Sequence, residues 1–392
     1  MDYRPLTVDD RERSLALEQY AFQQGLAPSL LDADRLAQFR GLFLDGQFVA
    51  QLEIFALRVQ LGHGADAPMG GLGAVASVPE LRRRGHVEIL LRHAVDELRA
   101  AGVNLCMLYP FKSSFYGRYG WATCMERRAY KGAPALFRSF KSAPGRWVPV
   151  DRQTIPELDQ IHRAALRGRF GVLVRDEAWW AEQILQDWEG RPRHGYIWRD
   201  EAGRGRAYTI FRFNDTTSGR TIVCRDMVAL DPEARAQLFA FMAGHEDQIA
   251  EVEFRAPADA PVNLLFPNPL HCALEPHFML RLLDVPAALE AYPFPRELSG
   301  RFSFTLTDDW IATNQGSFLL ELSAGRGMVS RLAAGAATDL QLDARVLTQL
   351  YSRLLRPRTA ATFGLLTVGE RAALDLAEEA FAGLAPFSSD MF

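Results

Sequence analysis

The sequence has few of the features that mark secreted or membrane proteins. Its four cysteines lie far apart among 392 residues and form no C-x-x-C pair, which favours reduced thiols over a disulfide framework. The first segment, "MDYRPLTVDDRERSLALEQYAF", carries charges throughout and lacks the apolar core of a signal peptide. No apolar run reaches the ~18 residues that a membrane-spanning helix needs. We therefore expect a cytoplasmic protein with no membrane partner.

A strong charge of either sign is absent as well. The chain has 44 Lys and Arg against 48 Asp and Glu, so its net charge of −4 gives no indication of a nucleic-acid partner. Any basic site must be local. Nothing resembles a Walker phosphate-binding sequence, and the segment "HCALEPH" (271–277) has no second half that would complete a metal site. A turn is the simpler interpretation of that segment, so we expect no metal.

What is present is an ordinary globular composition, 48% hydrophobic and 23% charged, in a length that suggests two or three domains. Hydrophobic spacing and turn residues, such as the Asp45-Gly46 pair, predict the elements of the first region. These are a helix over 15–24, a hairpin over 41–61, a strand over 70–78, a helix through 90–98, a strand over 103–111 and a short helix leading into a strand over 113–124. A strand, helix and strand in succession imply a right-handed crossover and a mixed α/β layer.

The order of elements partly repeats after a segment with Pro, Gly and charges (141–152) that is typical of a linker. The second region is expected to contain a helix over 155–168, a hairpin over 194–213, a strand over 221–230, a helix over 231–247 and a strand over 249–257. From about residue 283 the pattern changes to a helix, extended stretches and further helices, which indicates a third, α+β module. We therefore expect domains at 1–143, 144–284 and 285–392.

The stretch "VPELRRRGHVEILLRHAVDEL" (78–98) places three arginines and a glycine where a strand gives way to a helix. Backbone amides at a helix start lack intrahelical partners and can bind an anion. The glycine lets a phosphate approach the backbone closely, and the arginines add positive charge, so the turn suits a pyrophosphate. The alternative is an ordinary solvated turn. In the second region the corresponding residues begin with Asp231 and Pro232, which suit a helix start and would repel an anion.

This order of elements, with "AVASVPELRRRG" and the aromatic "FYGRYGW", resembles the GNAT superfamily of acetyltransferases. Arg82, Gly85 and Val87 occupy the motif R-x-x-G-x-G/A, with Val in place of the last small residue. The whole chain is similar to the Eis (enhanced intracellular survival) family. That resemblance implies tandem GNAT-like mixed-sheet α/β domains, the first catalytic and the second degenerate. A sterol-carrier-like α+β domain would follow them and supply the terminal carboxylate.

The resemblance also implies the site for acetyl coenzyme A (acetyl-CoA), the expected cosubstrate. Strand residues 75–77 would offer main-chain groups to the pantetheine arm in the manner of an added strand, and the arginine turn would wrap the pyrophosphate. The cofactor-binding residues implied are Val75, Ala76, Ser77, Arg82, Arg83, Arg84, Gly85, His86, Val87, Glu88, Phe111 and Lys112.

Two catalytic groups are implied in the same way. Tyr116 matches the general acid of the family, because a phenol of pKa ~10 can protonate a departing thiolate whose pKa is about 8.5 by analogy with Cys. The alternative for Tyr116 is a core aromatic beside Phe115. The terminal carboxylate of Phe392 matches the general base, and the alternative is a frayed tail. Met391 stands where relatives often carry an acid, with Asp390 one place earlier.

The expected activity is direct acetyl transfer to a primary amine, on a small polycation such as an aminoglycoside or on a lysine side chain. The resemblance further implies a homohexamer built as a dimer of trimers. Two other functions are open. The protein could carry an apolar ligand in its C-terminal module beside a vestigial acetyltransferase half, or it could be a regulatory acyl-CoA sensor that keeps the arginine turn without needing Tyr116 or a fixed terminus.

Overall fold

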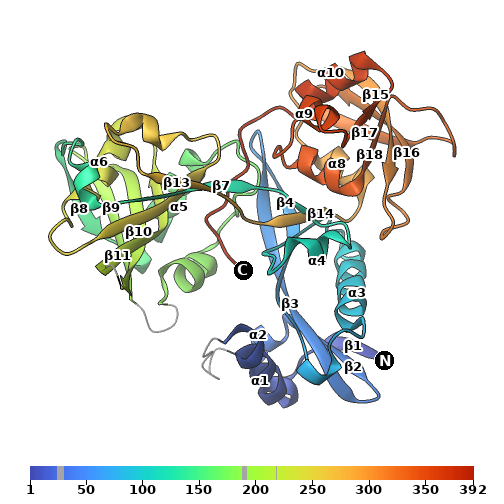
Figure 1. Cartoon of the computed structure of the whole chain (residues 1–392), viewed down its shortest axis with the longest axis horizontal. Helices are drawn as coiled ribbons and strands as arrows, with labels where there is room; N and C mark the ends of the chain where they lie inside the picture. The colour runs from blue at the N-terminus through green and yellow to red at the C-terminus, as the bar shows by residue number, and fades with distance from the viewer. Residues whose placement is uncertain (24–30, 188–191, 218) are drawn as a thin grey trace.

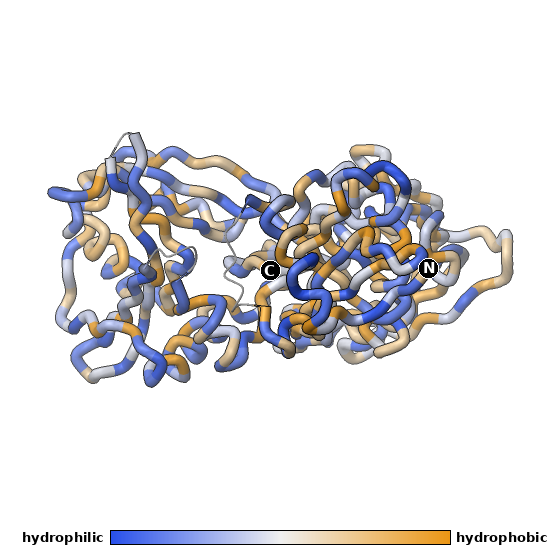
Figure 2. The backbone as a smooth tube through the Cα atoms, turned by 90° about the horizontal axis from the view of Figure 1, so that it is seen from below, coloured by the Kyte–Doolittle hydropathy of each residue, from blue (hydrophilic) through white to orange (hydrophobic). Residues whose placement is uncertain are grey.

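A computed structural model describes residues 1–23, 31–187, 192–217 and 219–392. Within these residues the strands form three sheets, and Figure 1 shows them as three lobes with the end of the chain lying between the first two. Hydrophobic and hydrophilic segments alternate along the chain (Figure 2), and none of the described helices is long and apolar enough to cross a membrane. The expected order of two mixed α/β layers and an α+β module is confirmed.

The first sheet contains the predicted hairpin and crossover. Its strands, in spatial order, are β1 (Asp2–Pro5), β2 (Phe39–Leu44), β3 (Gln47–Gly62), β4 (Ala65–Ser77), β5 (Leu105–Leu108), β14 (Met279–Leu282) and β6 (Ala122–Thr123). Its helices are α1 (Arg11–Phe22), α2 (Ala33–Leu36), α3 (His86–Ala100) and α4 (Ser113–Gly117). Asp45 and Gly46 both have positive φ, as a two-residue hairpin turn requires. The predicted helix over 15–24 is α1, although Gln24 lies outside the described residues.

The second sheet also has seven strands among the described residues. Its strands, in spatial order, are β13 (His271–Pro276), β7 (Glu126–Gly132), β12 (Glu251–Pro257), β11 (Gly219–Ala229), β10 (Gly205–Thr216), β9 (Arg193–Asp200) and β8 (Gly145–Pro149). The helices α5 (Ile155–Ala165) and α6 (Pro232–Ala243) pack on it, and a π-helix spans Trp179–Leu185. The segment 141–152, which the sequence predicts as a linker, contributes the edge strand β8.

The two sheets exchange strands across the division expected near residue 143. β7 precedes that division but pairs with β12 and β13 in the second sheet. β14 comes after the second sheet in the chain, yet it pairs with β5 and β6 in the first. Because each sheet contains a strand from the other half of the chain, backbone hydrogen bonds join the two halves.

The third sheet belongs to the C-terminal module. It contains β17 (Arg326–Arg331), β16 (Gly316–Ser323), β15 (Gly300–Thr307), β18 (Leu340–Asp343) and β19 (Thr367–Val368), with helices α7 (Val285–Ala291), α8 (Ala344–Tyr351), α9 (Pro357–Thr362) and α10 (Arg371–Ala380). A buried ion pair between Arg281 of β14 and Asp308, 2.6 Å long, ties this module to the first sheet. After α10 the chain leaves the module and returns to the first two sheets, where Phe387 donates a backbone hydrogen bond to the Phe170 carbonyl at 2.9 Å.

Candidate active site

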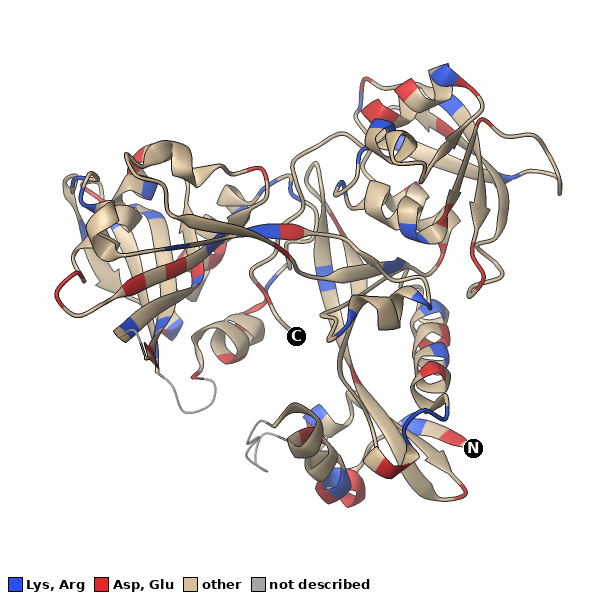
Figure 3. Ribbon diagram, in the orientation of Figure 1, with Lys and Arg blue, Asp and Glu red and all other residues tan. Residues whose placement is uncertain are grey.

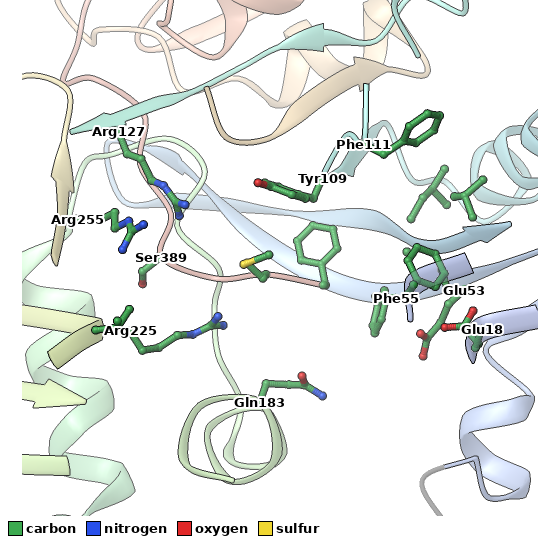
Figure 4. A pocket seen from close by; sticks show the side chains of 18 of the residues that line it. Glu18, Glu53, Phe55, Tyr109, Phe111, Arg127, Gln183, Arg225, Arg255 and Ser389 are labelled. Carbon is green, nitrogen blue, oxygen red and sulfur yellow. The ribbon is translucent and has the colours of Figure 1, made fainter. Parts of the chain in front are cut away.

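A cavity of about 670 Å³ lies between the first and second sheets. It is lined by α1, β3 and β4, by residues around α4, by strands of the second sheet and by the end of the chain (Figure 4). The lining residues are Glu18, Phe22, Arg35, Glu53, Phe55, Leu72, Gly73, Ala74, Val75, Tyr109, Phe111, Tyr116, Arg127, Gln183, Arg193, Phe211, Arg212, Val223, Cys224, Arg225, Arg255, Ser389, Met391 and Phe392.

The last residue of the chain is inside this cavity. The ring of Phe392 stacks on Phe278, with centroids 4.7 Å apart and planes 16° apart, and it also contacts Phe55 at 5.8 Å. Its carboxyl carbon lies 3.4 Å from the point where a Cβ on Gly73 would stand. The terminal carboxylate therefore lies against the middle of β4, and the glycine leaves room for it.

A buried ionic cluster fixes the segment before Phe392, and we call this cluster the tail clamp. It consists of Arg175, Asp226, Ser389 and Asp390. Arg175 donates to Asp390 (Nε to Oδ1, 3.0 Å) and to Asp226 (Nη1 to Oδ2, 2.6 Å), and all three side chains are almost inaccessible. Ser389 Oγ donates to Asp226 Oδ1 at 2.6 Å. A charge network this dry and this well paired gives the tail one conformation.

Asp390, the acidic side chain nearest the terminus, is buried in the tail clamp. Asp390 is 1% exposed and accepts a further hydrogen bond from Trp179 Nε1 at 2.9 Å, so it faces the clamp and does not line the cavity. The backbone carbonyl of Asp390 lies 3.1 Å from His277 Nε2. Burial raises the pKa of Asp226, but the charge of Arg175 and its hydrogen bonds outweigh burial and hold that pKa far below its usual range. The Asp226 carboxylate therefore stays ionised.

Tyr116, on α4, lines the cavity from the first sheet. Its side chain is 3% exposed and makes edge contacts with the rings of Phe111 (5.6 Å) and Phe115 (5.1 Å). It also belongs to the hydrophobic core under α3, as expected from the alternative that it is a core aromatic. No group among the described residues hydrogen-bonds its hydroxyl, and burial raises its pKa. The hydroxyl therefore keeps its proton at neutral pH and is free to donate it.

Two adjacent strands separate beside Tyr116. β4 and β5 pair in parallel only from Gly70↔Cys106 to Leu72↔Leu108, where β5 ends while β4 continues to Ser77. Opposite Leu52 the register with β3 shifts, and Ala74 has a positive φ of 52°, which marks a bulge. Beyond Leu72, one edge of β4 therefore has no neighbouring strand among the described residues. Val75, Ala76 and Ser77 lie on this free edge.

The arginine turn begins α3, as the sequence predicts. Gly85 is the N-cap with φ of 81°, and Arg83 also has a positive φ, 63°. The first backbone bond of the helix comes from the Ile89 amide to the Gly85 carbonyl, so the amides of residues 86–88 point outward. In Figure 3 the ribbon at this end of α3 has the colour of basic residues, and Arg82, Arg83 and Arg84 are exposed there.

Other predicted cofactor residues take varied positions around the turn. His86 is buried, and Val87 packs partly into the core. The Glu88 carboxylate pairs with Arg92 at 3.0 Å, which leaves its backbone amide as the group available at the helix start. Phe111 is 70% exposed and lines the cavity. Lys112, exposed at the start of α4, is not among the lining residues.

The corresponding turn of the second half is built differently. Asp231 caps α6 by accepting a hydrogen bond from the Ala234 amide at 2.9 Å, and Arg206 pairs with the same carboxylate at 2.8 Å. The Asp231 carboxylate already binds the amide at this helix start, so it would repel a second anion. Among the described residues, no group of His, Cys, Asp and Glu is arranged to hold a metal ion.

Most residues of the far wall of the cavity were not predicted from the sequence. This wall is a set of arginines, one from each of five neighbouring strands of the second sheet: Arg127, Arg255, Arg225, Arg212 and Arg193. The signal was present, because Arg212 and Arg225 interrupt apolar strand patterns. Which face they occupy depends on strand pairing far apart in the chain. The acidic residues opposite, Glu18 and Glu53, were missed for the same reason.

Comparisons with known proteins agree with this geometry. Family profiles described as acetyltransferase (GNAT) domains match residues 2–124 and 171–282, and a sterol carrier protein domain matches residues 285–389. An uncharacterised N-acetyltransferase of Streptomyces griseus is 27% identical over the full length of both chains. The N-acetyltransferase Eis of Mycobacterium tuberculosis is 24% identical and is covered over 79% of its length by 81% of this chain.

Solved structures give the same result for the whole fold. The crystal structure of a GCN5-related N-acetyltransferase from Anabaena variabilis matches all of both chains with a TM-score of 0.90 at 25% identity. Eis1 from Mycobacterium abscessus has the same fold over the full length of both chains, with a TM-score of 0.78 at 21% identity. With two GNAT domains, a sterol-carrier domain and full-length relatives of this kind, the chain is an acetyl-CoA-dependent N-acetyltransferase of the GNAT superfamily, and it is similar to the N-acetyltransferase Eis over 81% of its length.

Proposed function

We propose that the protein transfers the acetyl group directly from acetyl-CoA to a primary amine, in the cavity between the first two sheets. The observation that carries the proposal is the position of the Phe392 carboxylate. It lies against β4 in the same cavity as the Tyr116 hydroxyl and the free edge of that strand. A donor of acetyl groups, a proton acceptor and a proton donor would meet there.

The residues present fit acetyl-CoA. Outward amides and three exposed arginines at the start of α3 suit its pyrophosphate, with Gly85 allowing close approach. The main-chain groups of residues 75–77 suit the pantetheine arm, whose amides can pair as a strand would. His86, Val87 and Glu88 would contribute backbone amides, and Phe111 and Lys112 would border the arm where it enters the cavity. When bound, acetyl-CoA supplies an activated thioester.

Protons are moved by two groups of this chain. The Phe392 carboxylate, ionised at neutral pH because its intrinsic pKa is about 3.3–3.7, would take a proton from the incoming ammonium, directly or through a water. Tyr116, which burial keeps protonated, would give its proton to the sulfur of the departing thiolate. Transfer from such a weak acid is feasible because the same dry surroundings raise the basicity of the thiolate.

The proposal is tested with Tyr116→Phe in an assay of amine-dependent thiol release. A general acid typically contributes roughly 100- to 10,000-fold, so kcat should fall by that order while the melting-temperature rise caused by acetyl-CoA stays as in the parent. Phe115→Leu, next in sequence but without a hydroxyl to lose, is the matched control. Unchanged turnover in Tyr116→Phe removes it as the acid.

The same assay separates this function from its alternatives. An apolar ligand that co-purifies in stoichiometric amount, with no thiol released from any amine, would favour a carrier. Acetyl-CoA binding without turnover would favour a sensor. The family resemblance suggests aminoglycosides or lysine side chains as acceptors and a homohexamer, and the cysteine pattern suggests a cytoplasmic location. Light scattering of the purified protein measures the oligomeric state.

A further inference from the structure

The far wall of the cavity carries a continuous row of arginines. One arginine comes from each of the adjacent strands β7, β12, β11, β10 and β9, and Figure 4 shows three of them on the side opposite Glu18 and Glu53. We call Arg127, Arg255, Arg225, Arg212 and Arg193, in that spatial order, the arginine row.

Strand pairing brings these like charges together. Arg212 and Arg193 are direct cross-strand partners on β10 and β9. The parallel ladder of β11 and β12 ends at the pair Val223↔Glu253. Arg225 and Arg255 each lie two residues beyond that pair, on the same face of the sheet. Like charges directly opposite on a sheet destabilise it, so folding alone gives no reason for this arrangement.

The centre of the arginine row lacks counter-ions. Among the described residues, the side chains of Arg225 and Arg212 have no ion pair and no hydrogen-bond acceptor, and the buried Nε of Arg225 has no partner. Burial, together with repulsion from Arg225 and Arg212, lowers the pKa of Arg193 to about 10. Burial also lowers the pKa of Arg225, despite the attraction of Asp390 and Asp226.

At the β9 end of the row, Arg193 donates to the Gln183 and Ile184 carbonyls, each at 2.6 Å, and the Arg127 end is only partly neutralised. Arg255 pairs with Glu253, and the Nε of Arg127 lies 3.5 Å from Glu275. The buried Nε atoms of Arg127 and Arg255 still lack hydrogen-bond acceptors among the described residues. Two glutamates therefore face five arginines on this wall, and the carboxylates of Asp226 and Asp390 are already engaged by Arg175.

We propose that the acceptor is a primary amine that carries an oxyanion, a carboxylate or a phosphate, which the arginine row binds while the amine lies at the Phe392 carboxylate. This inference rests on the proposed acetyl transfer and names its substrate class. Guanidinium groups bind both oxyanions through paired N–H donors. A small polycation would place additional positive charge against this wall and be repelled.

The row is separate from the site that suits acetyl-CoA phosphates. Those phosphates fit the start of α3, on the first sheet, whereas all members of the row belong to strands of the second sheet. Changing the row should therefore alter the preference for acceptors and leave acetyl-CoA binding unchanged. In the second half, Asp231 already caps the start of α6, so that half does not bind acetyl-CoA phosphates there. Its sheet can therefore serve the acceptor instead.

The test uses four amines that share a five-methylene spacer and differ in the far group: 6-aminohexanoate, 5-aminopentyl phosphate, hexylamine and 1,5-diaminopentane. The series is repeated with shorter and longer spacers, and kcat/KM is measured by thiol release. Hydrogen bonds to charged groups predict a preference of roughly 10- to 150-fold for the oxyanion-bearing amines over the diamine. Arg225→Met and Arg212→Met should each reduce that preference. Arg220→Met, on the same strand as Arg225 but exposed and outside the cavity, should retain it.

The results test two claims separately: acetyl transfer to an amine, and an acceptor that carries an oxyanion. An equal or greater kcat/KM for 1,5-diaminopentane, or a preference that survives Arg225→Met combined with Arg212→Met, overturns the substrate class and leaves acetyl transfer standing. If acetyl-CoA binds but no amine is acetylated, the proposed function fails. The melting shift with 6-acetamidohexanoate, compared with N-acetyl-1,5-diaminopentane, then decides separately whether the row binds an oxyanion. A shift that Arg225→Met abolishes supports the row, and the absence of any shift overturns it.

Discussion

Releasing the tail clamp should release the terminal carboxylate from the active site. The change is Asp390→Asn, which keeps the shape of the side chain and removes the charge that Arg175 contacts at 3.0 Å. Arg175 retains Asp226 at 2.6 Å, so no buried cation is left without a partner and the domain should stay folded. The loss is then that of a charge-assisted hydrogen bond, about 1.5–3 kcal/mol.

That free energy converts into a population of open tails. A factor of ten per 1.4 kcal/mol gives a rise of roughly 10- to 150-fold in the fraction of molecules whose last residues are free. Carboxypeptidase removes Phe392 only from the open form, so its trimming rate, followed by mass spectrometry, should rise by the same factor when opening is fast relative to cleavage. The value of kcat for acetyl transfer should fall once the open form dominates, and the KM for acetyl-CoA should not change.

Two comparisons make the result interpretable. Asp375→Asn removes an exposed partner of Arg358 in the C-terminal module and should leave trimming and kcat unchanged. Arg175→Met leaves two buried carboxylates unpaired and should lower stability by about 3–5 kcal/mol, enough to affect folding as well as activity. Trimming of Asp390→Asn at the parent rate would refute the reasoning, because the clamp would not be what holds the tail.

Two further predictions concern the first half. Arg83→Ala combined with Arg84→Ala should abolish the rise in melting temperature caused by acetyl-CoA, whereas Arg206→Ala, at the corresponding turn of the second half, should not. An unchanged shift in the double variant would contradict the pyrophosphate cradle. For Glu18, burial raises the pKa to about 7 in the folded protein, from the usual 4.5 of a glutamate carboxyl. Neutral Glu18 therefore stabilises the fold below pH ~4.5, and on the order of 3 kcal/mol is lost as the pH rises through about 7. Glu18→Gln should remove this loss, so its stability relative to the parent, measured by urea unfolding, should increase between pH 5 and pH 8; a constant difference would contradict the raised pKa.

Local patterns predicted much of the first half. Leu90, Leu91, Ala94, Val95 and Leu98 recur at helical spacing, and all five are buried on one face of α3. The Asp45-Gly46 turn and the arginine turn are likewise set by residues close together in the chain. The positive φ angles at Gly85 and Asp45 are determined by residues close to them in the chain, so a local pattern is enough to predict them.

Features that depend on distant pairing could not be predicted in this way. β14 lies between β5 and β6 in the first sheet, and nothing in residues 279–282 indicates that these two strands would be its neighbours. Asp390 stands next to Met391 in the sequence, but its partner Arg175 lies more than 200 residues earlier. The arginine row is spread over five strands, so it forms only when the second sheet is assembled. The arginine turn could be predicted from neighbouring residues, and Tyr116 and Phe392 are candidates through the family resemblance, whereas the arginine row could not be predicted.

The most direct test of the account is the effect of one glycine added after Phe392. The addition moves the terminal carboxylate by up to about 3.6 Å, which is beyond hydrogen-bond reach of its former position, and it leaves every side chain in place. We expect the melting shift with acetyl-CoA to be retained and amine-dependent thiol release to fall by roughly 100-fold or more. Thiol release at the parent rate would contradict the claim that the end of the chain is the base of this active site.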